Sequence, residues 1–204
     1  MIQYYVTTNE KNAIVAHSSN LVLPPEEIFR DEWKPIQNAI EGEIMRDGVP
    51  LYELRSGKAA NRTKAEIAAD TYEFVVKPMI EKKKIESEDL LADFLAQNPL
   101  KSYAKGGKPA LYNVTFGKQG ILTGKILIAT AATSKGIPYP LTWNATGQPC
   151  EPWDLSELEH LSFEIAIYVT PFVTHQQNLE IMFKSCKTLE ELAGIAIDYS
   201  GVMS

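Results

Sequence analysis

The last third of the chain carries apolar residues at helical spacing over a long stretch, and this pattern restricts the fold more than any other feature. Asp154 and Glu157 form a capping signature at its start, with acidic groups at the positive end of the helix dipole. The apolar positions that follow are Leu158, Leu161, Ile165, Tyr168, Val169, Leu179, Met182 and Phe183. We therefore expect a helical last third, kinked or split at Pro171, and a final helix capped at Thr188.

The start of the chain alternates between apolar and polar residues instead. Ile2, Tyr4 and Val6 fall on one side of a predicted strand, a polar turn follows at residues 9–12, and residues 13–16 are apolar. This pattern predicts a β-hairpin.

A first helix is expected after the hairpin. Two prolines and two glutamates at residues 24–27 favour a helix start, and apolar residues recur at helical spacing as far as Ile44. Pro35 predicts a kink or two shorter helices, and Gly42 and Gly48 are candidate stops.

Two more helices are expected before residue 100. Thr63 and Glu66 match a capping box and open a helix that Pro78 interrupts. Ser87 is expected to cap the next helix, which ends before Pro99. A short strand is possible at residues 51–54.

Residues 101–110 are polar, basic and contain two glycines, so we interpret them as a linker between two domains. The predicted domains are an N-terminal α+β interaction domain at residues 1–100 and a mostly helical domain at residues 111–204. The second is expected to contain a strand at 111–116, a buried alanine-rich helix at 120–133 and a short strand at 141–143. The fold class is α+β, with an N-terminal β-hairpin plus helices followed by a mainly helical domain with short strands.

The charge distribution argues against a nucleic-acid partner. The net charge is −6, and residues 136–204 hold nine acidic residues and two lysines, which gives −7. A phosphate backbone needs clustered lysine and arginine. No apolar run is long enough for a bilayer and no secretory signal precedes the hairpin, so we expect no membrane association, no secretion and reduced Cys150 and Cys186.

No catalytic, cofactor-binding or metal-binding motif is recognised, and the chain is expected not to be an enzyme and to need no cofactor. Residues 117–126 fail as a phosphate-binding loop, because Gln119 and Ile126 replace the required glycine and hydroxyl residue. His17, His160 and His175 lack metal-ligand spacing. Glu157, Glu164 and Asp198 are interpreted as solvating acids, and Cys150 as a small buried residue. An enzyme would have to assemble its site from these dispersed residues.

Aromatic residues in the loop-rich stretch at 139–153 are the best interface candidates. Tyr139, Trp143 and Trp153 lie in this stretch. Large aromatic side chains dominate both protein cores and interface hot spots. We therefore treat these three residues as a candidate interface.

Four segments carry a family resemblance. They are the alanine-rich stretch at 126–132, the strand ending in Trp143, the acid-capped helix start at 154–158 and the segment at 186–192, which contains Thr-Leu-Glu-Glu-Leu. Over about residues 112–199 the chain resembles an uncharacterised C-terminal domain of bacteriophage tail-fibre, tail-assembly and baseplate-associated proteins. The resemblance brings no catalytic residues. It implies a structural role with phage tail or fibre proteins as partners, in a homo- or hetero-oligomer.

Four functions are open. The first is a structural subunit of a phage tail, located in the virion tail and in the host cytoplasm during assembly. The second is a tail-fibre assembly chaperone, which leaves the finished particle. A hydrolase built from distant residues and an inhibitor of host defence are the other two.

Overall fold

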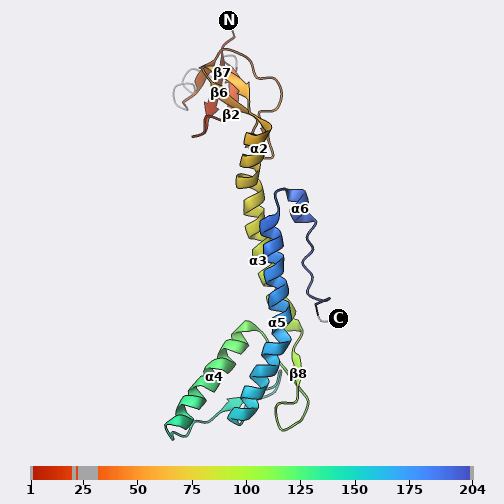
Figure 1. The fold of residues 1–204 in the computed structure, drawn as a ribbon. Coiled ribbons are helices and arrows are strands. Elements are labelled where there is room, and N and C mark those ends of the chain that lie inside the picture. Colours follow the sequence, from red (N-terminus) through yellow and green to blue (C-terminus); the bar gives the residue numbers. More distant parts are fainter. Residues whose placement is uncertain (1, 20–21, 23–31, 203–204) are drawn as a thin grey trace. The chain divides into compact units, whose positions relative to one another are not determined.

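The computed structural model describes residues 2–19, 22 and 32–202 (Figure 1). The chain divides into two compact units. Unit 1 contains residues 1–81 and 187–189, and unit 2 contains residues 82–186 and 190–204. Small antiparallel sheets combine with long helices, which confirms the α+β class. The division falls after Glu81, within a helix, and not at the expected linker of residues 101–110.

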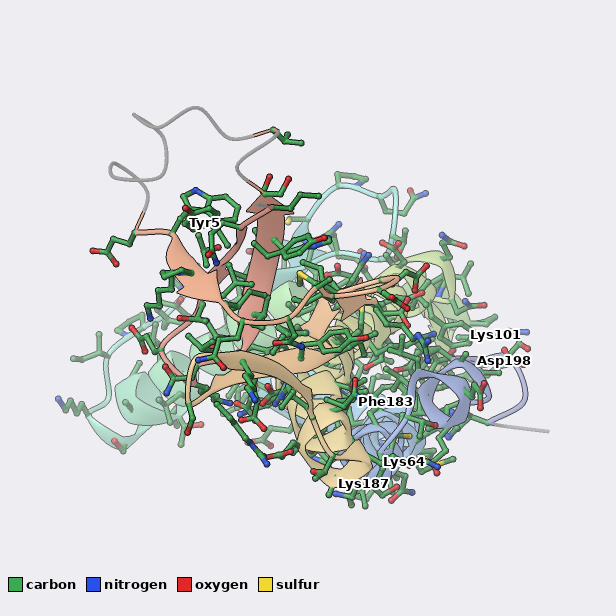
Figure 2. All side chains as sticks on the ribbon, turned by 90° about the horizontal axis from the view of Figure 1, so that it is seen from above. Tyr5, Lys64, Lys101, Phe183, Lys187 and Asp198 are labelled. Carbon is green, nitrogen blue, oxygen red and sulfur yellow. The ribbon has the colours of Figure 1, made fainter. Side chains whose placement is uncertain are left out.

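The expected N-terminal hairpin forms one edge and the centre of a three-stranded antiparallel sheet in unit 1. Strands β1 (Tyr4–Thr8) and β2 (Ile14–Ser19) are its two arms, and the order is β2-β1-β3. The Asn9 side chain accepts hydrogen bonds from the backbone of Lys11 and Ala13, which closes the turn. Figure 2 draws the side chains and labels Tyr5 on β1.

The expected helix from residue 24 to Ile44 is wrong where the structure describes it. Residues 24–31 lie outside the described part, and Lys34–Ile36 forms strand β3, paired antiparallel with β1. Pro35 stands opposite Tyr5 in this edge strand, where the missing N–H of proline is tolerated. Ile36 and Ile40 pack with Val6 and Ile14 in the sheet core, so apolar spacing that resembled a helix serves a strand and a loop.

Two tight hairpins complete unit 1, and both are built on residues with positive φ. Strands β4 (Met45–Arg46) and β5 (Val49–Pro50) meet through Asp47 and Gly48. Strands β6 (Tyr52–Arg55) and β7 (Lys58–Asn61) meet through Ser56 and Gly57. Two successive positive φ values define the type I′ turn, whose twist matches that of the paired strands. Gly48 therefore ends no helix.

One continuous helical segment follows, in place of the two helices expected. It consists of α2 (Lys64–Thr71), the π-helical turn η1 (Tyr72–Val76) and α3 (Lys77–Gln97). The capping box of Thr63 and Glu66 is present at its start, as expected. The wide π-turn lies directly before Pro78, where proline would otherwise clash with the preceding turn. Ser87 starts no helix, because it is buried inside α3 and donates to the Lys84 carbonyl.

Unit 2 combines the second part of α3 with two further long helices and two small hairpins. The helices are α4 (Phe116–Ser134) and α5 (Leu155–Ser185). The hairpins are β8 (Leu100–Ser102) with β9 (Ala110–Tyr112), and β10 (Thr142–Trp143) with β11 (Glu151–Pro152). Residues 101–110 are thus a hairpin within the unit. The short α6 (Leu189–Ala193) follows Thr188, as expected.

The core of unit 2 forms where α3, α5 and residue Tyr199 meet. The rings of Phe94 and Phe172 lie 4.9 Å apart, and Tyr199 packs against Phe94 at 6.2 Å. The Tyr199 hydroxyl donates to the Ser87 carbonyl across 2.9 Å. Helix α5 runs through Pro171 as a single helix of 31 residues, so the expected kink or split does not divide it. Its buried stripe follows the apolar spacing of the sequence, from Leu158 to Phe183.

Candidate functional site

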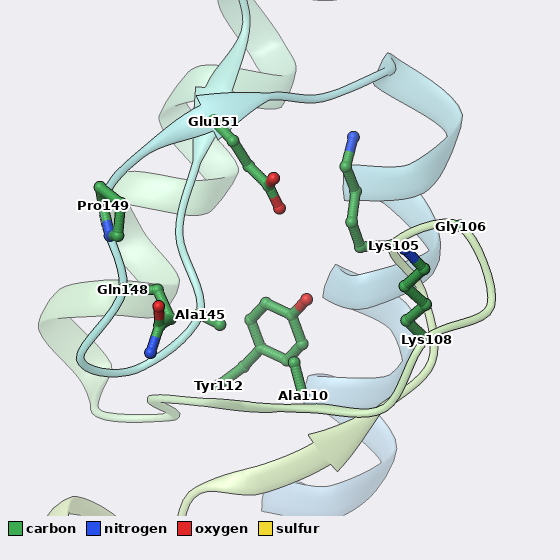
Figure 3. A pocket seen from close by; sticks show the side chains of 9 residues that line it. All are labelled: Lys105, Gly106, Lys108, Ala110, Tyr112, Ala145, Gln148, Pro149 and Glu151. Carbon is green, nitrogen blue, oxygen red and sulfur yellow. The ribbon is translucent and has the colours of Figure 1, made fainter.

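A cavity of about 410 Å³ in unit 2 lies between the loops of the two hairpins (Figure 3). Lys105, Gly106 and Lys108 come from the β8–β9 loop, and Gln148 and Glu151 come from the β10–β11 side. The remaining lining residues are Ala110, Tyr112, Ala145 and Pro149. The wall therefore mixes cations, a carboxylate and apolar surface, a mixture that suits polar ligands of no single charge.

Glu157 fixes one wall of this cavity from the first turn of α5. Its Oε2 accepts hydrogen bonds from the Asp154 backbone at 3.0 Å and from Lys105 Nζ at 2.9 Å, and its Oε1 accepts one from the Gly106 backbone at 3.2 Å. The hydrogen bond from the Asp154 backbone, followed by that from Lys105, lowers the pKa of Glu157 below its ordinary value. A carboxylate held in this way ties a loop to a helix and is a poor general base.

An aromatic pair forms the floor beneath the Lys105 ammonium group. Tyr112 and Trp153 meet edge to face with ring centroids 5.7 Å apart, and Lys105 Nζ lies 5.2 Å above the Trp153 ring. Burial, and then the nearby Glu151 carboxylate, raise the pKa of Tyr112, which keeps its hydroxyl protonated. Figure 3 shows this hydroxyl and the Glu151 carboxylate pointing into the space between the loops.

The three aromatic residues expected at an interface are placed differently from one another. Trp143 and Trp153 are each 5% exposed and belong to the core, so the expectation that they anchor a partner is corrected. Trp143 is further covered by Lys118, whose Nζ lies 5.7 Å from the ring centroid. Each tryptophan lies in or beside the short β10–β11 ladder, which turns the loop-rich stretch into a packed hairpin. Tyr139 is 38% exposed and stays a candidate.

The histidines and cysteines do not line the cavity. His160 pairs with Glu164 at 3.1 Å on α5, and His175 packs edge-on against Tyr199. Cys150 is exposed beside Asn144, whereas Cys186 is buried, and burial raises the pKa of its thiol. The expectation of a buried Cys150 is therefore wrong. Within the described residues, no group of three histidine, cysteine or acidic side chains could hold a metal ion.

Sequence reasoning missed an exposed apolar surface on α4, because an apolar helix was expected to be buried. The helix expected at 120–133 is present within α4, but among the side chains of α4 Leu122 and Ala129 are buried while Ile121, Leu127 and Ile128 are 53%, 70% and 52% exposed. At 100° per residue these three share one side of the helix. We define the α4 face as Gly117, Gly120, Ile121, Gly124, Leu127, Ile128 and Ala131.

A second exposed apolar pair lies on the first half of α5. Phe163 is 66% exposed and Ile167 is 59% exposed, and a separation of four residues makes them neighbours on the helix surface. We define these two residues as the α5 face. Among the described residues, no helix is both long and apolar enough to cross a membrane.

Comparison with known proteins adds no relative. The chain matches no protein family model, no curated protein and no solved structure. The phage-tail resemblance over about residues 112–199 therefore stays a prediction, and the candidate sites rest on the geometry described above.

Proposed function

We propose that this chain is a non-enzymatic structural subunit of a bacteriophage tail, in the baseplate or linking the tail fibres, which acts through protein–protein interfaces. The observation that carries the proposal is the uncharged α4 face, which exposes three large aliphatic side chains. Soluble monomers rarely expose a contiguous apolar patch of this kind, and larger ones mark interaction sites. The family resemblance supplies the tail as the setting.

The α5 face supports the same reading. Phe163 and Ile167 expose more than half of their surface on a helix whose opposite side is fully used in the core. A subunit held permanently in a particle can bury such side chains against its neighbours, at roughly 25 cal/mol for each Å² of apolar surface. The dispersed histidines and cysteines fit a role in binding better than one in bond-making chemistry.

The test is whether the chain stays in finished particles. Particles of the phage that encodes it would be purified, and the tails examined by mass spectrometry and by immunogold labelling. We expect the chain in stoichiometric amount on the tail. Presence in infected cells with absence from particles would support the assembly chaperone instead and overturn the structural proposal.

A matched pair of variants makes the test specific to the α4 face. Ile128→Glu places a charge within the face, and Thr130→Glu places the same charge on an exposed position of the same helix outside it. We expect the first variant to lower incorporation into particles and the second to leave it unchanged. Equal incorporation of both variants would remove the α4 face from the proposal.

A further inference from the structure

The α4 face is apolar, and another helix can also approach its backbone closely. Gly120 and Gly124 lie one turn apart, and a Cβ added at either would meet nothing within 4 Å. The helix backbone is thus uncovered there, with Ile121, Leu127 and Ile128 rising on both sides. The open space over the two glycines leaves room for a bulky side chain from another helix.

The α5 face has the matching shape. Phe163 and Ile167 project from one side of their helix with the same separation of four residues, or about 6 Å along the axis. Two glycines at this spacing on one helix can receive two large side chains at this spacing on another. Such a packing of projecting side chains into hollows is how helices fit together in protein cores.

Charge selects the pairing of the two faces. Residues 116–135 carry three lysines and no acidic residue, whereas residues 154–167 carry four acidic residues and no lysine or arginine. Lys125 neighbours Ile121 and Ile128, and Glu159 neighbours Phe163, at separations of three or four residues. Within the described part of the chain, neither Lys125 nor Glu159 makes an ion pair.

Pairing of like faces is disfavoured by the same charges. Two α4 faces would bring the two Lys125 side chains together, and two α5 faces would bring the two Glu159 side chains together. We propose that the α4 face of one copy of this chain docks on the α5 face of a second copy, with Phe163 and Ile167 seated over Gly120 and Gly124. This deepens the proposed function, on which it rests, by naming a second copy as one partner.

The experiment measures the mass of the purified full-length chain by analytical ultracentrifugation over a range of concentrations. We expect the wild-type chain to self-associate. Ile128→Glu places an acid opposite the acidic α5 side, and Phe163→Lys places a cation opposite the lysine-bearing α4 side. Each variant alone is expected to weaken association by about tenfold or more. Thr130→Glu, outside the face, is expected to associate as the wild type does.

Mixing the two variants decides which faces meet. Ile128→Glu keeps an intact α5 face and Phe163→Lys keeps an intact α4 face, so their mixture is expected to form a one-to-one complex. If α4 contacted α4, the Phe163→Lys variant would still self-associate. If α5 contacted α5, the Ile128→Glu variant would still self-associate. Either result overturns the proposal. A wild-type chain that stays monomeric at every concentration also overturns it.

Variants that reverse a charge keep the test valid if replacing an apolar residue perturbs folding. Lys125→Glu and Glu159→Lys change side chains that make no ion pair among the described residues, and circular dichroism would verify their helix content. Each is expected to weaken association, and their mixture to restore it. Salt is expected to weaken the wild-type association by screening these charges.

A monomeric chain that is nevertheless found in purified tails would refute self-association alone, whereas an associating chain absent from tails would refute the tail role alone.

Discussion

Arg62 donates a hydrogen bond from Nη2 to Oδ2 of Asp70 across 2.7 Å, and both side chains are more than nine-tenths buried in unit 1. The other Asp70 oxygen accepts from Lys11 Nζ at 2.8 Å. Arg62 also donates from Nη1 to the Pro50 carbonyl, so it joins the β4–β5 hairpin to α2. The Asp70 carboxylate thus connects the N-terminal hairpin turn, the segment between β7 and α2, and α2 itself.

Asp70→Asn is expected to destabilise unit 1 by about 3–5 kcal/mol, because it leaves a buried guanidinium without its counter-charge. Chemical denaturation followed by circular dichroism measures this change. Glu73→Gln is the matched control, since the Glu73–Lys77 pair lies on the surface, and its unfolding midpoint should stay that of the wild type. An Asp70→Asn protein as stable as the control would show that the pair is not needed.

The same carboxylate predicts a loss of stability in acid. Burial raises the pKa of Asp70, but hydrogen bonds from Lys11 and Arg62 outweigh burial, and the net pKa lies below the ordinary value of 3.8. The stabilisation is therefore complete above the unfolded pKa and is lost as the pH falls through the lower folded pKa. We expect the unfolding free energy to drop below about pH 4. In Asp70→Asn this drop should be smaller, and an unchanged pH profile would contradict the assignment.

Tyr199 predicts a loss of stability at the alkaline end. Burial is the main cause that raises its pKa to about 12, from an ordinary value of 10.0. Because the unfolded chain releases this proton first, the stabilisation is complete below pH 10 and is lost as the pH rises toward 12. Tyr199→Phe removes this dependence and the hydrogen bond to the Ser87 carbonyl, at a cost of about 1 kcal/mol near neutrality. Tyrosinate absorbance and denaturation at each pH measure both effects, with exposed Tyr103→Phe as the control.

Glu157→Gln is expected to loosen the cavity wall without unfolding unit 2. The substitution weakens the capping box of α5 and the bonds to Lys105 and Gly106, at a cost of about 1 kcal/mol. Hydrogen exchange at the Gly106 amide is the direct readout, because that amide donates to Glu157, and it should speed up. Glu159→Gln, two residues along on the exposed side, should leave the amide protected as in the wild type.

Two capping pairs in the sequence predicted helix starts correctly. Thr63 with Glu66, and Asp154 with Glu157, mark real helix starts because each pair satisfies backbone donors locally. Local chemistry of this kind needs no knowledge of distant residues. The N-terminal hairpin was predictable for the same reason, through its polar turn at Asn9.

Prolines and glycines were harder to interpret because their effect depends on tertiary context. Pro78 and Pro171 lie inside long helices, since a π-turn or a water-facing side tolerates the lost hydrogen bond. Gly48 and Gly57 follow residues with positive φ and close type I′ hairpins, a signal present in the sequence as Asp-Gly and Ser-Gly. Ile36 and Ile40 imitate a helical pattern because a short strand followed by a loop can bury residues at the same spacing.

The candidate surfaces were the least predictable feature. Trp143 and Trp153 are core residues through the pairing of β10 with β11, and the sequence predicted the strand that ends at Trp143 but not its partner strand. The exposure of α4 was not predicted, because composition reports how apolar a helix is and not whether the chain supplies enough partners to cover it. Three glycines at residues 117, 120 and 124 were the available signal, since they weaken a helix unless something packs closely on it.

Pro171 changes the hydrogen bonding of α5 next to the exposed Phe163 and Ile167. Pro171 has no N–H, so the Ile167 carbonyl four residues earlier receives no helical hydrogen bond from it. That oxygen belongs to the last residue of the α5 face, whose side chains are apolar. A polar side chain of a docking helix that donates a hydrogen bond to this oxygen would favour one alignment of the two apolar surfaces over the others.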